Sequence, residues 1–340
     1  MLAADSTPDA TAKFLAGLPV EGTPLEDYAK APEWKTHANE FDRAWKQFDE
    51  RQLSKIRSWA PQALGAEYQG EAPMYYMFSG PDFLYANAFF PNASTYILCG
   101  TEPVGPVPDI PRIPPHILSS ALANLRKSLD SVLSWSFFIT KNMKVDLRQI
   151  QLTGTLPILY VFLARADCTI DSVETVALDK TGAFVPEGNG ATHGVKIIFT
   201  GPAGRAQTLY YFTTDLADWA IKANPNFTAF CERQGQGVTL LKAASYLMHS
   251  DNFSKVRSYL LTHSKVILQD DSGIPYRFFS RDKWDVRFYG RYLGPIKRFP
   301  ENGQLDLAQD NAAASPSPLP FSFGYQWQPS RSSLIVAKPR

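Results

Sequence analysis

Short apolar segments that favour β-strands recur along this chain, and helical segments separate them. The clearest case is residues 75–78 and 95–99, which are joined by residues 82–90, a segment that can form a short helix before Pro91. A strand, a helix and a second strand in this order form a β-α-β unit. This order predicts the α/β or α+β class, with a mixed sheet flanked by helices.

Further helices and strands follow from apolar spacing. Aromatic residues at helical spacing over 34–59 predict a long N-terminal helix that ends at Pro61, and leucines three or four apart predict a second helix over 117–133. The apolar run 156–164 is read as a buried strand, residues 136–140 as another strand, and residues 240–249 as a helix. Residues 284–292 alternate and predict a strand with one face in the core.

Changes in composition and in the expected helices and strands divide the chain into four regions. We expect an N-terminal helical arm at 1–66, a first α/β half at 67–190, a second half at 191–310, and a linker with a C-terminal β-hairpin at 311–340. The hairpin is expected to pair residues 321–327 with residues 334–337. Residues 76–80 and 210–214 are weakly similar in sequence. One interpretation is an internal duplication, and the alternative is that any α/β chain repeats such elements.

Charge and apolar content exclude some partners. Lys and Arg total 34 against 33 Asp and Glu, a net charge of +1, so we expect neither nucleic-acid binding nor attraction to an anionic membrane. The longest apolar run is about half of the ~20 residues that span a bilayer, so no membrane insertion is expected. The expected partner is a small molecule, a glycan or a protein.

Three cysteines, Cys99, Cys168 and Cys231, have no metal-ligand spacing and allow at most one disulfide. We therefore predict small buried thiols, no metal site and no cofactor. The first residues are similar to the start of a mature exported protein, so we expect a periplasmic or secreted protein, with the cytoplasm as the alternative.

Few residues stand out as catalytic. The signatures of elbow-type serine hydrolases, P-loop NTPases and zincin proteases are absent from the sequence. His249 and His263 end two successive predicted helices, with carboxylates close in sequence, and with an Asp they can supply a general base. The alternative is that both histidines only cap their helices.

Adjacent carboxylates give the best candidate site. Asp270 and Asp271 follow an apolar strand and precede a Ser-Gly turn, so they can share a proton, and Arg277 can hold one of them. The alternative is a turn with no other role, because Asp, Ser and Gly are common turn residues. Asp82 and Asp215 also follow strands and are candidates for binding or for helix capping.

The sequence leaves two functions open. The first is a ligand-binding or interaction protein, in which some of the 13% aromatic residues stack on a ligand. The second is a hydrolase or transferase with an Asp/His acid-base site around Asp270 and Asp271. In either case ligands should collect at the carboxyl ends of parallel strands, so we expect Asp82, Asp215 and Asp270 to approach one another, with Lys141 in a neighbouring turn.

Overall fold

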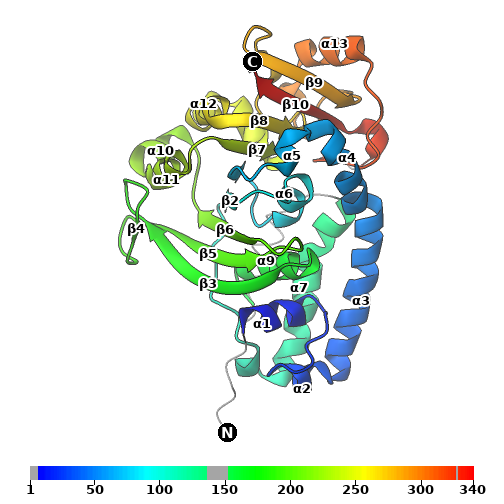
Figure 1. Cartoon of the computed structure of the whole chain (residues 1–340), viewed down its shortest axis with the longest axis vertical. Helices are drawn as coiled ribbons and strands as arrows, with labels where there is room; N and C mark the ends of the chain where they lie inside the picture. Colours follow the sequence, from blue (N-terminus) through cyan, green and yellow to red (C-terminus); the bar gives the residue numbers. More distant parts are fainter. Residues whose placement is uncertain (1–6, 136–151, 327) are drawn as a thin grey trace.

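The computed structural model describes residues 7–135, 152–326 and 328–340, and ten strands in these residues form one mixed sheet. Its order is β4-β3-β5-β6-β2-β1-β7-β8-β10-β9 (Figure 1). The strands are β1 (Met74–Tyr76), β2 (Thr95–Gly100), β3 (Thr169–Leu178), β4 (Phe184–Val185), β5 (Thr192–Thr200), β6 (Ala206–Thr213), β7 (Gly237–Leu241), β8 (Ser264–Gln269), β9 (Trp284–Gly290) and β10 (Ser333–Pro339).

Five neighbouring strands in the middle of the sheet, β6-β2-β1-β7-β8, are parallel. All three residues of β1 are buried, as a central strand covered on both faces requires. Strands β1 and β2 with the helix between them confirm the predicted β-α-β unit. Because the five strands are parallel, all of their carboxyl ends lie at one edge of the sheet.

Helices cover both faces of the sheet (Figure 1). Tyr76 faces one core with the helices numbered below ten, and Tyr75 faces the other core with the later helices. The longer α-helices are α1 (Pro8–Leu15), α3 (Pro32–Phe48), α4 (Ser54–Leu64), α6 (Phe83–Phe89), α7 (Pro115–Trp135), α9 (Leu156–Arg165), α10 (Asp218–Ala223), α11 (Asn226–Gln234), α12 (Ser254–His263) and α13 (Leu305–Ala314); α2 (Glu26–Ala29) and α5 (Ala66–Gln69) are single turns.

Four local predictions are wrong. Residues 156–164 lie in helix α9, all ten residues of which are buried, so its sequence carries no helical periodicity. Pro61 lies inside α4, which continues to Leu64. Residues 240–249 contain the end of β7 and a 3-10 helix, Ala243–His249, instead of one α-helix. His37, which the pattern places on the polar side of its helix, is buried and hydrogen-bonds the Leu15 carbonyl at 2.9 Å.

The C-terminal strands β9 and β10 form an antiparallel hairpin, and β10 also pairs with β8. The strand that pairs with β10 is thus residues 284–290, whereas residues 321–327 contribute only an isolated bridge between Phe323 and Gln326. Trp284 is buried, but Val286 and Phe288 are only half-buried because β9 is an edge strand. The described elements do not show an internal duplication.

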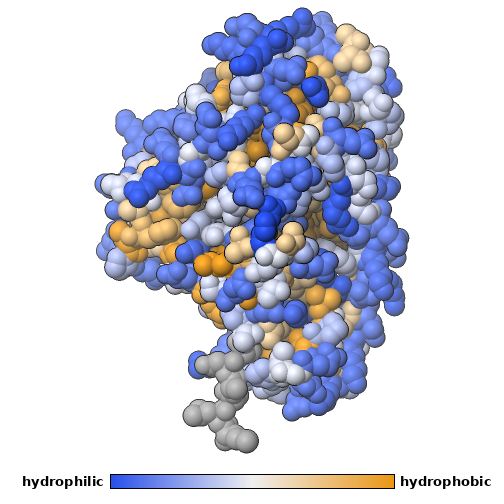
Figure 2. Space-filling view, in the orientation of Figure 1, coloured by the Kyte–Doolittle hydropathy of each residue, from blue (hydrophilic) through white to orange (hydrophobic). Residues whose placement is uncertain are grey.

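The fold class is confirmed: the protein has a mixed sheet with helices on both faces and an N-terminal helical arm. The three cysteines are free and buried, and burial raises the pKa of the Cys99 thiol to about 12. None of the helices in the described ranges has the length and apolar content needed to cross a membrane. Figure 2 shows a mostly hydrophilic face with an apolar patch over β4, where Phe184 is 50% exposed.

Candidate functional site

Polar residues that follow three adjacent parallel strands meet at the carboxyl edge of the sheet. Asp82 comes from the loop after β1, Lys242 follows β7, and Asp270 and Asp271 follow β8. The Lys242 ammonium lies 2.5 Å from Asp82 Oδ2, and both side chains are 2% exposed. The order β1-β7-β8 therefore brings together residues that are up to 189 positions apart, from 82 to 271.

Asp82 is held from three sides. Its Oδ1 accepts a 3.4 Å hydrogen bond from the Tyr85 amide and caps helix α6, as the sequence alternative for this residue predicted. Its Oδ2 accepts a 2.9 Å hydrogen bond from the Tyr76 hydroxyl as well as the bond from Lys242. This carboxylate is therefore fixed before any ligand binds.

Lys242 is the cation of the cluster. Its Nζ lies 3.3 Å from the centroid of the Tyr85 ring, which gives it a cation-π contact inside the core. Burial lowers the pKa of Lys242, and the negative charges of Asp82 and Asp270 oppose that change. Replacing this residue would leave Asp82 buried without its cation.

Asp270 accepts hydrogen bonds from its own turn, one at 3.0 Å from the Ser272 amide and one from the Ser272 hydroxyl. Its other oxygen lies against the backbone of Gly324, where an added Cβ would be 1.7 Å from Oδ2. Burial raises the pKa of Asp270 above the ordinary range of a carboxyl group.

Asp271 accepts a hydrogen bond from the Tyr246 hydroxyl. Burial raises the pKa of Asp271, and the adjacent charge of Asp270 raises it further. Two carboxylates placed side by side in the interior disfavour their doubly ionised form, which is the behaviour expected of a group that exchanges a proton near neutral pH.

Two residues beside the cluster adopt left-handed backbone conformations. Phe78, the second residue after β1, has φ 60°, and Ala243 has φ 59° directly after Lys242. Neither residue is a glycine, so each costs about 1–2 kcal/mol. Strain of this kind at the ends of two adjacent strands is typical of binding and catalytic sites.

A cavity of about 560 Å³ lies over the ends of β7 and β8. Aromatic rings form its walls: Phe299 lies 5.0 Å and Tyr325 6.1 Å from the Tyr246 ring, between centroids. His249 also lines this cavity, and its Nε2 lies 3.2 Å from the Asp271 carbonyl oxygen. Burial lowers the pKa of His249 to about 4, so the imidazole is neutral at neutral pH.

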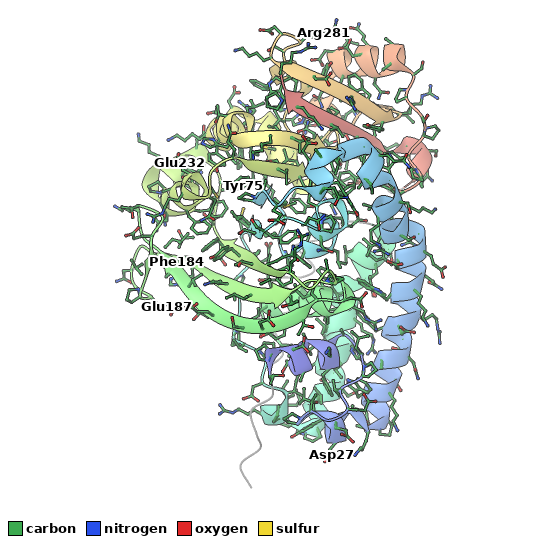
Figure 3. All side chains as sticks on the ribbon, viewed as in Figure 1. Asp27, Tyr75, Phe184, Glu187, Glu232 and Arg281 are labelled. Atoms are coloured by element: carbon green, nitrogen blue, oxygen red, sulfur yellow. The ribbon has the colours of Figure 1, made fainter. Side chains whose placement is uncertain are left out.

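A groove of about 580 Å³ lies at the same edge of the sheet, beyond β2. Residues 103–105 after β2 and residues 213–215 after β6 line it, together with Glu187 and Trp219, whose side chain is 69% exposed. Figure 3 shows Glu187 at the side of the molecule near β4, whereas Tyr75 lies in the middle of the sheet. None of the residues that line the groove also lines the aromatic cavity, so the two are separate openings along one edge.

The other predicted site residues lie apart from the cluster. His263 ends α12 and precedes β8, so it lies at the opposite edge of the sheet from Asp270. Asp215 accepts a 2.9 Å hydrogen bond from the Ala217 amide and lines the groove, on the far side of β2 from Asp82. Arg277 is exposed and lies over the Phe278 ring, without a contact to either Asp270 or Asp271. Lys141 lies outside the described residues.

Sequence reasoning missed Lys242, Tyr246 and Glu102. The signal for Lys242 was present, because residues 237–241 are an apolar run with β-favouring residues that ends at this lysine. Reading 240–249 as a helix hid that signal. Glu102 follows β2 in the same way, is 5% exposed and belongs to the same carboxyl edge.

The donor set does not favour a metal. No group of three or more His, Cys, Asp and Glu side chains within residues 7–135, 152–326 and 328–340 is arranged to hold an ion. At the cluster, the ammonium of Lys242 occupies the position beside Asp82 that a cation would otherwise take.

The fold and the site define a doubly wound α/β protein with a charged cluster at the carboxyl edge of its parallel strands. Comparisons with protein-family models, with curated proteins and with solved structures found no match.

Replacing Asp271 with asparagine should stabilise the protein at pH 8. Below the ordinary pKa of a carboxyl group both the folded and the unfolded chain hold the proton, and as the pH rises the unfolded chain releases it first. The free energy of unfolding therefore falls until the pH passes the raised folded pKa of Asp271. Asparagine avoids this loss, about 1.4 kcal/mol for each pKa unit of the shift, and keeps an acceptor for Tyr246.

Urea unfolding of both proteins at pH 5 and pH 8 measures this difference. As a control, Asp171→Asn changes an exposed carboxylate on β3, and we expect it to leave the stability nearly unchanged. An Asp271→Asn variant that is less stable than the natural protein at pH 8 would show that the Asp271 charge is stabilised in the fold.

Proposed function

We propose that this protein is a transferase that binds a sulfonium nucleoside, of the S-adenosylmethionine type, along the carboxyl edge of β1 and β2. The observation that carries the proposal is the order of the five parallel strands, β6-β2-β1-β7-β8, in which the chain reverses its direction of winding at β1. When the parallel strands β1, β2, β6, β7 and β8 are counted from one to five in chain order, their order in the sheet is 3-2-1-4-5, which is a doubly wound order. Nucleoside-containing ligands bind at the point where the winding of such a sheet reverses.

The loop after β1 and the end of β2 support a nucleoside. Gly80 has φ 55°, and its amide donates a 3.1 Å hydrogen bond to the Cys99 carbonyl, which holds the loop against β2. At Gly100 an added Cβ would lie 2.7 Å from the Glu102 carboxylate and 3.1 Å from Gly80 Cα. The lack of a side chain at Gly100 thus makes room for the Glu102 carboxylate beside the end of β2 and the loop.

Glu102 has the position that doubly wound proteins use for the ribose. An acidic residue about 20 positions after the glycine turn, at the end of the second strand, hydrogen-bonds the ribose hydroxyl groups. Here Gly80 and Glu102 are 22 positions apart in sequence, from 80 to 102. The Glu102 carbonyl accepts hydrogen bonds of 2.9 Å from Tyr211 and Thr213, so the residue is anchored on β6.

The charges favour a nucleoside over a nucleotide. Asp82, Glu102, Asp215, Asp270 and Asp271 follow four of the five parallel strands, and Lys242, which follows β7, is ion-paired with Asp82. In addition, the Asp82 carboxylate occupies the N-terminus of α6, where a pyrophosphate would bind in a dinucleotide site. An acidic edge repels phosphate groups and attracts a sulfonium cation.

The groove beyond β2 has room for the base. Its 580 Å³ is within the usual range of small-molecule sites, and it begins directly after Glu102. Trp219 offers a ring on which a base can stack, and Asp215 offers an acceptor for an exocyclic amino group.

When bound, a sulfonium nucleoside supplies an electrophilic carbon, so the supported reaction is group transfer. A hydrolase or transferase was one of the two functions that the sequence left open, and the proposal keeps the transferase. The sulfonium nucleoside is a cofactor that no sequence motif predicted. The proposal also favours the cytoplasm over export, because such nucleosides are intracellular metabolites, and three free cysteines are compatible with a reducing compartment.

Isothermal titration of the purified protein with S-adenosylmethionine, S-adenosylhomocysteine, ATP and NAD tests this function. We expect the two sulfur nucleosides to bind and the two phosphorylated ligands not to bind. Glu102→Gln should weaken binding of S-adenosylhomocysteine about 10- to 100-fold, because a hydrogen bond to a charged group is lost.

The control is Glu174→Gln on the exposed strand β3, which removes the same charge away from the groove and should leave the affinity unchanged. Binding of ATP or NAD with S-adenosylmethionine unbound, or equal affinity of the Glu102 and Glu174 variants, would refute the assignment.

A further inference from the structure

A third cavity lies at the edge of the sheet opposite the charged cluster. Its volume is about 440 Å³, within the usual range of small-molecule sites. Asn92 precedes β2, Asp167 precedes β3 and Gln207 lies at the start of β6, and all three line the cavity, so it lies where these strands begin. None of its lining residues also lines the groove or the aromatic cavity. The cavity is therefore separate from the proposed nucleoside site.

A π-helical turn, Asp49–Leu53, forms part of the cavity wall. It joins α3 to α4, and π-helical turns within longer helices are frequent at functional sites. Asp49 and Leu53 line the cavity, whereas Gln52 is buried and donates a 3.0 Å hydrogen bond to the Ser322 carbonyl. The turn thus places a carboxylate and an apolar side chain in one wall.

Two guanidinium groups are held at the cavity by other lining residues. Arg57 Nη2 lies 2.7 Å from Asp49 Oδ1, and Arg205 donates a hydrogen bond to the side-chain oxygen of Asn92 and another, at 2.6 Å, to Glu71. Because Asp49 and Asn92 line the cavity, these bonds place both guanidinium groups at its wall. The bonds involve terminal nitrogens alone, so each guanidinium retains N–H donors for a ligand carboxylate.

Asp167 is a lining carboxylate that stays unpaired. Within residues 7–135, 152–326 and 328–340 its side chain makes no hydrogen bond or ion pair. Burial lowers the pKa of Arg165, and the charge of Asp167 opposes that change, so Asp167 lies on the side where Arg165 packs against the Trp45 ring. The donors of Arg165 are used by the Ala16 carbonyl and Asp42. Asp167 is therefore the group that a ligand cation would pair with.

Apolar side chains complete the walls. The ring of Trp45 and the side chains of Leu18, Leu53 and Leu84 line the cavity beside the charged groups. A ligand that is only anionic would leave Asp167 unpaired, and a simple amine would leave the guanidinium donors unused. A ligand with an ammonium, a carboxylate and an apolar part satisfies all three kinds of wall.

We propose that this cavity binds a free amino acid with a large apolar side chain. Its ammonium would pair with Asp167, and its carboxylate would accept hydrogen bonds from Arg57 and Arg205. The site lies at the other edge of the sheet from the nucleoside, so it does not depend on the proposed transferase function.

Isothermal titration of the full-length protein at pH 7 tests this site with three probes of similar shape. L-Phenylalanine carries both charges, 2-phenylethylamine lacks the carboxylate, and 3-phenylpropionate lacks the ammonium. We expect L-phenylalanine to bind and the other two to bind at least about tenfold more weakly, because each loses a charged pair. L-Phenylalanine that does not bind, or either analogue binding equally well, would overturn the proposal.

Two variants separate the charges. Asp167 has φ 55°, a conformation that asparagine also adopts, so Asp167→Asn keeps the backbone. It should weaken L-phenylalanine binding about tenfold and leave 3-phenylpropionate unchanged. Arg205→Gln should weaken both of these probes and leave 2-phenylethylamine unchanged, since a half-exposed ion pair adds little to stability.

The matched controls are Asp171→Asn on β3 and Arg233→Gln at the end of α11, two exposed positions that do not line the cavity. Both should leave the affinity for L-phenylalanine unchanged, and an equal loss in either control would refute the site. S-Adenosylhomocysteine should not displace L-phenylalanine. Displacement would assign the amino acid to the nucleoside edge, whereas failure of the nucleoside to bind would leave this site standing.

Discussion

Replacing Lys242 with methionine is expected to lower the free energy of unfolding by about 3–5 kcal/mol. Methionine fills a similar volume and keeps the apolar contacts of the lysine stem, but it leaves the carboxylate of Asp82, 2% exposed, without its cation. A buried charge without a partner is among the most costly changes that a single substitution makes. Urea unfolding at pH 7 measures the loss.

The matched control is Lys30→Met. Lys30 lies 2.8 Å from Asp27, a similar ion pair in which both side chains are exposed, so we expect its loss to leave stability nearly unchanged. The double variant Asp82→Asn/Lys242→Met should recover part of the stability, because it leaves no buried charge unpaired. Equal stability of Lys242→Met and Lys30→Met would mean that water enters the cluster.

Gly324→Ala is expected to cost about 2–5 kcal/mol. Gly324 has φ 61°, and an added Cβ would lie 1.7 Å from Asp270 Oδ2. Asp270 cannot turn away without losing its hydrogen bonds to Ser272, since it is buried in the cluster. The substitution should also displace the Asp270 carboxylate. We therefore expect both the melting temperature and the pH dependence of stability to change.

Gly22→Ala separates the two causes. Gly22 has φ 73° with no atom within 4 Å of an added Cβ, so alanine there bears only the strain of the left-handed conformation, about 1–2 kcal/mol. The additional loss in Gly324→Ala measures the contact with Asp270. If the two variants lost equal stability, the loop that carries Gly324 would be free to move away from the cluster.

The cluster combines strain, neighbouring carboxylates and a buried ion pair in one place. Phe78 and Ala243 adopt costly backbone conformations, and Asp271 lies beside a second acid. A sequence selected only for stability has little reason to retain these features, whereas a site that binds and moves protons requires them. This contrast is why the expected stabilisation by Asp271→Asn bears on function.

Local pattern was sufficient for helix α7, which has an apolar face, and for the short apolar segments that are bounded by turn residues. Tyr75 and Tyr76 with the short segment after Asp82 predicted the β-α-β unit, and the leucines of α7 predicted that helix. Pattern failed where an element is buried all round, as in α9, because a helix without a polar face has no period to detect. It also failed at β7, which was merged with the 3-10 helix that follows it.

By itself the sequence determined the class of fold and the presence of acidic residues after its strands, because both depend on short segments of chain. Only the tertiary structure decided which of those residues meet. Strand order places Lys242 beside Asp82 and separates Asp215 from both by β2, and no local signal encodes the order in which parallel strands assemble. His263 and Asp270 flank the same strand, β8, yet its length keeps them at opposite edges of the sheet.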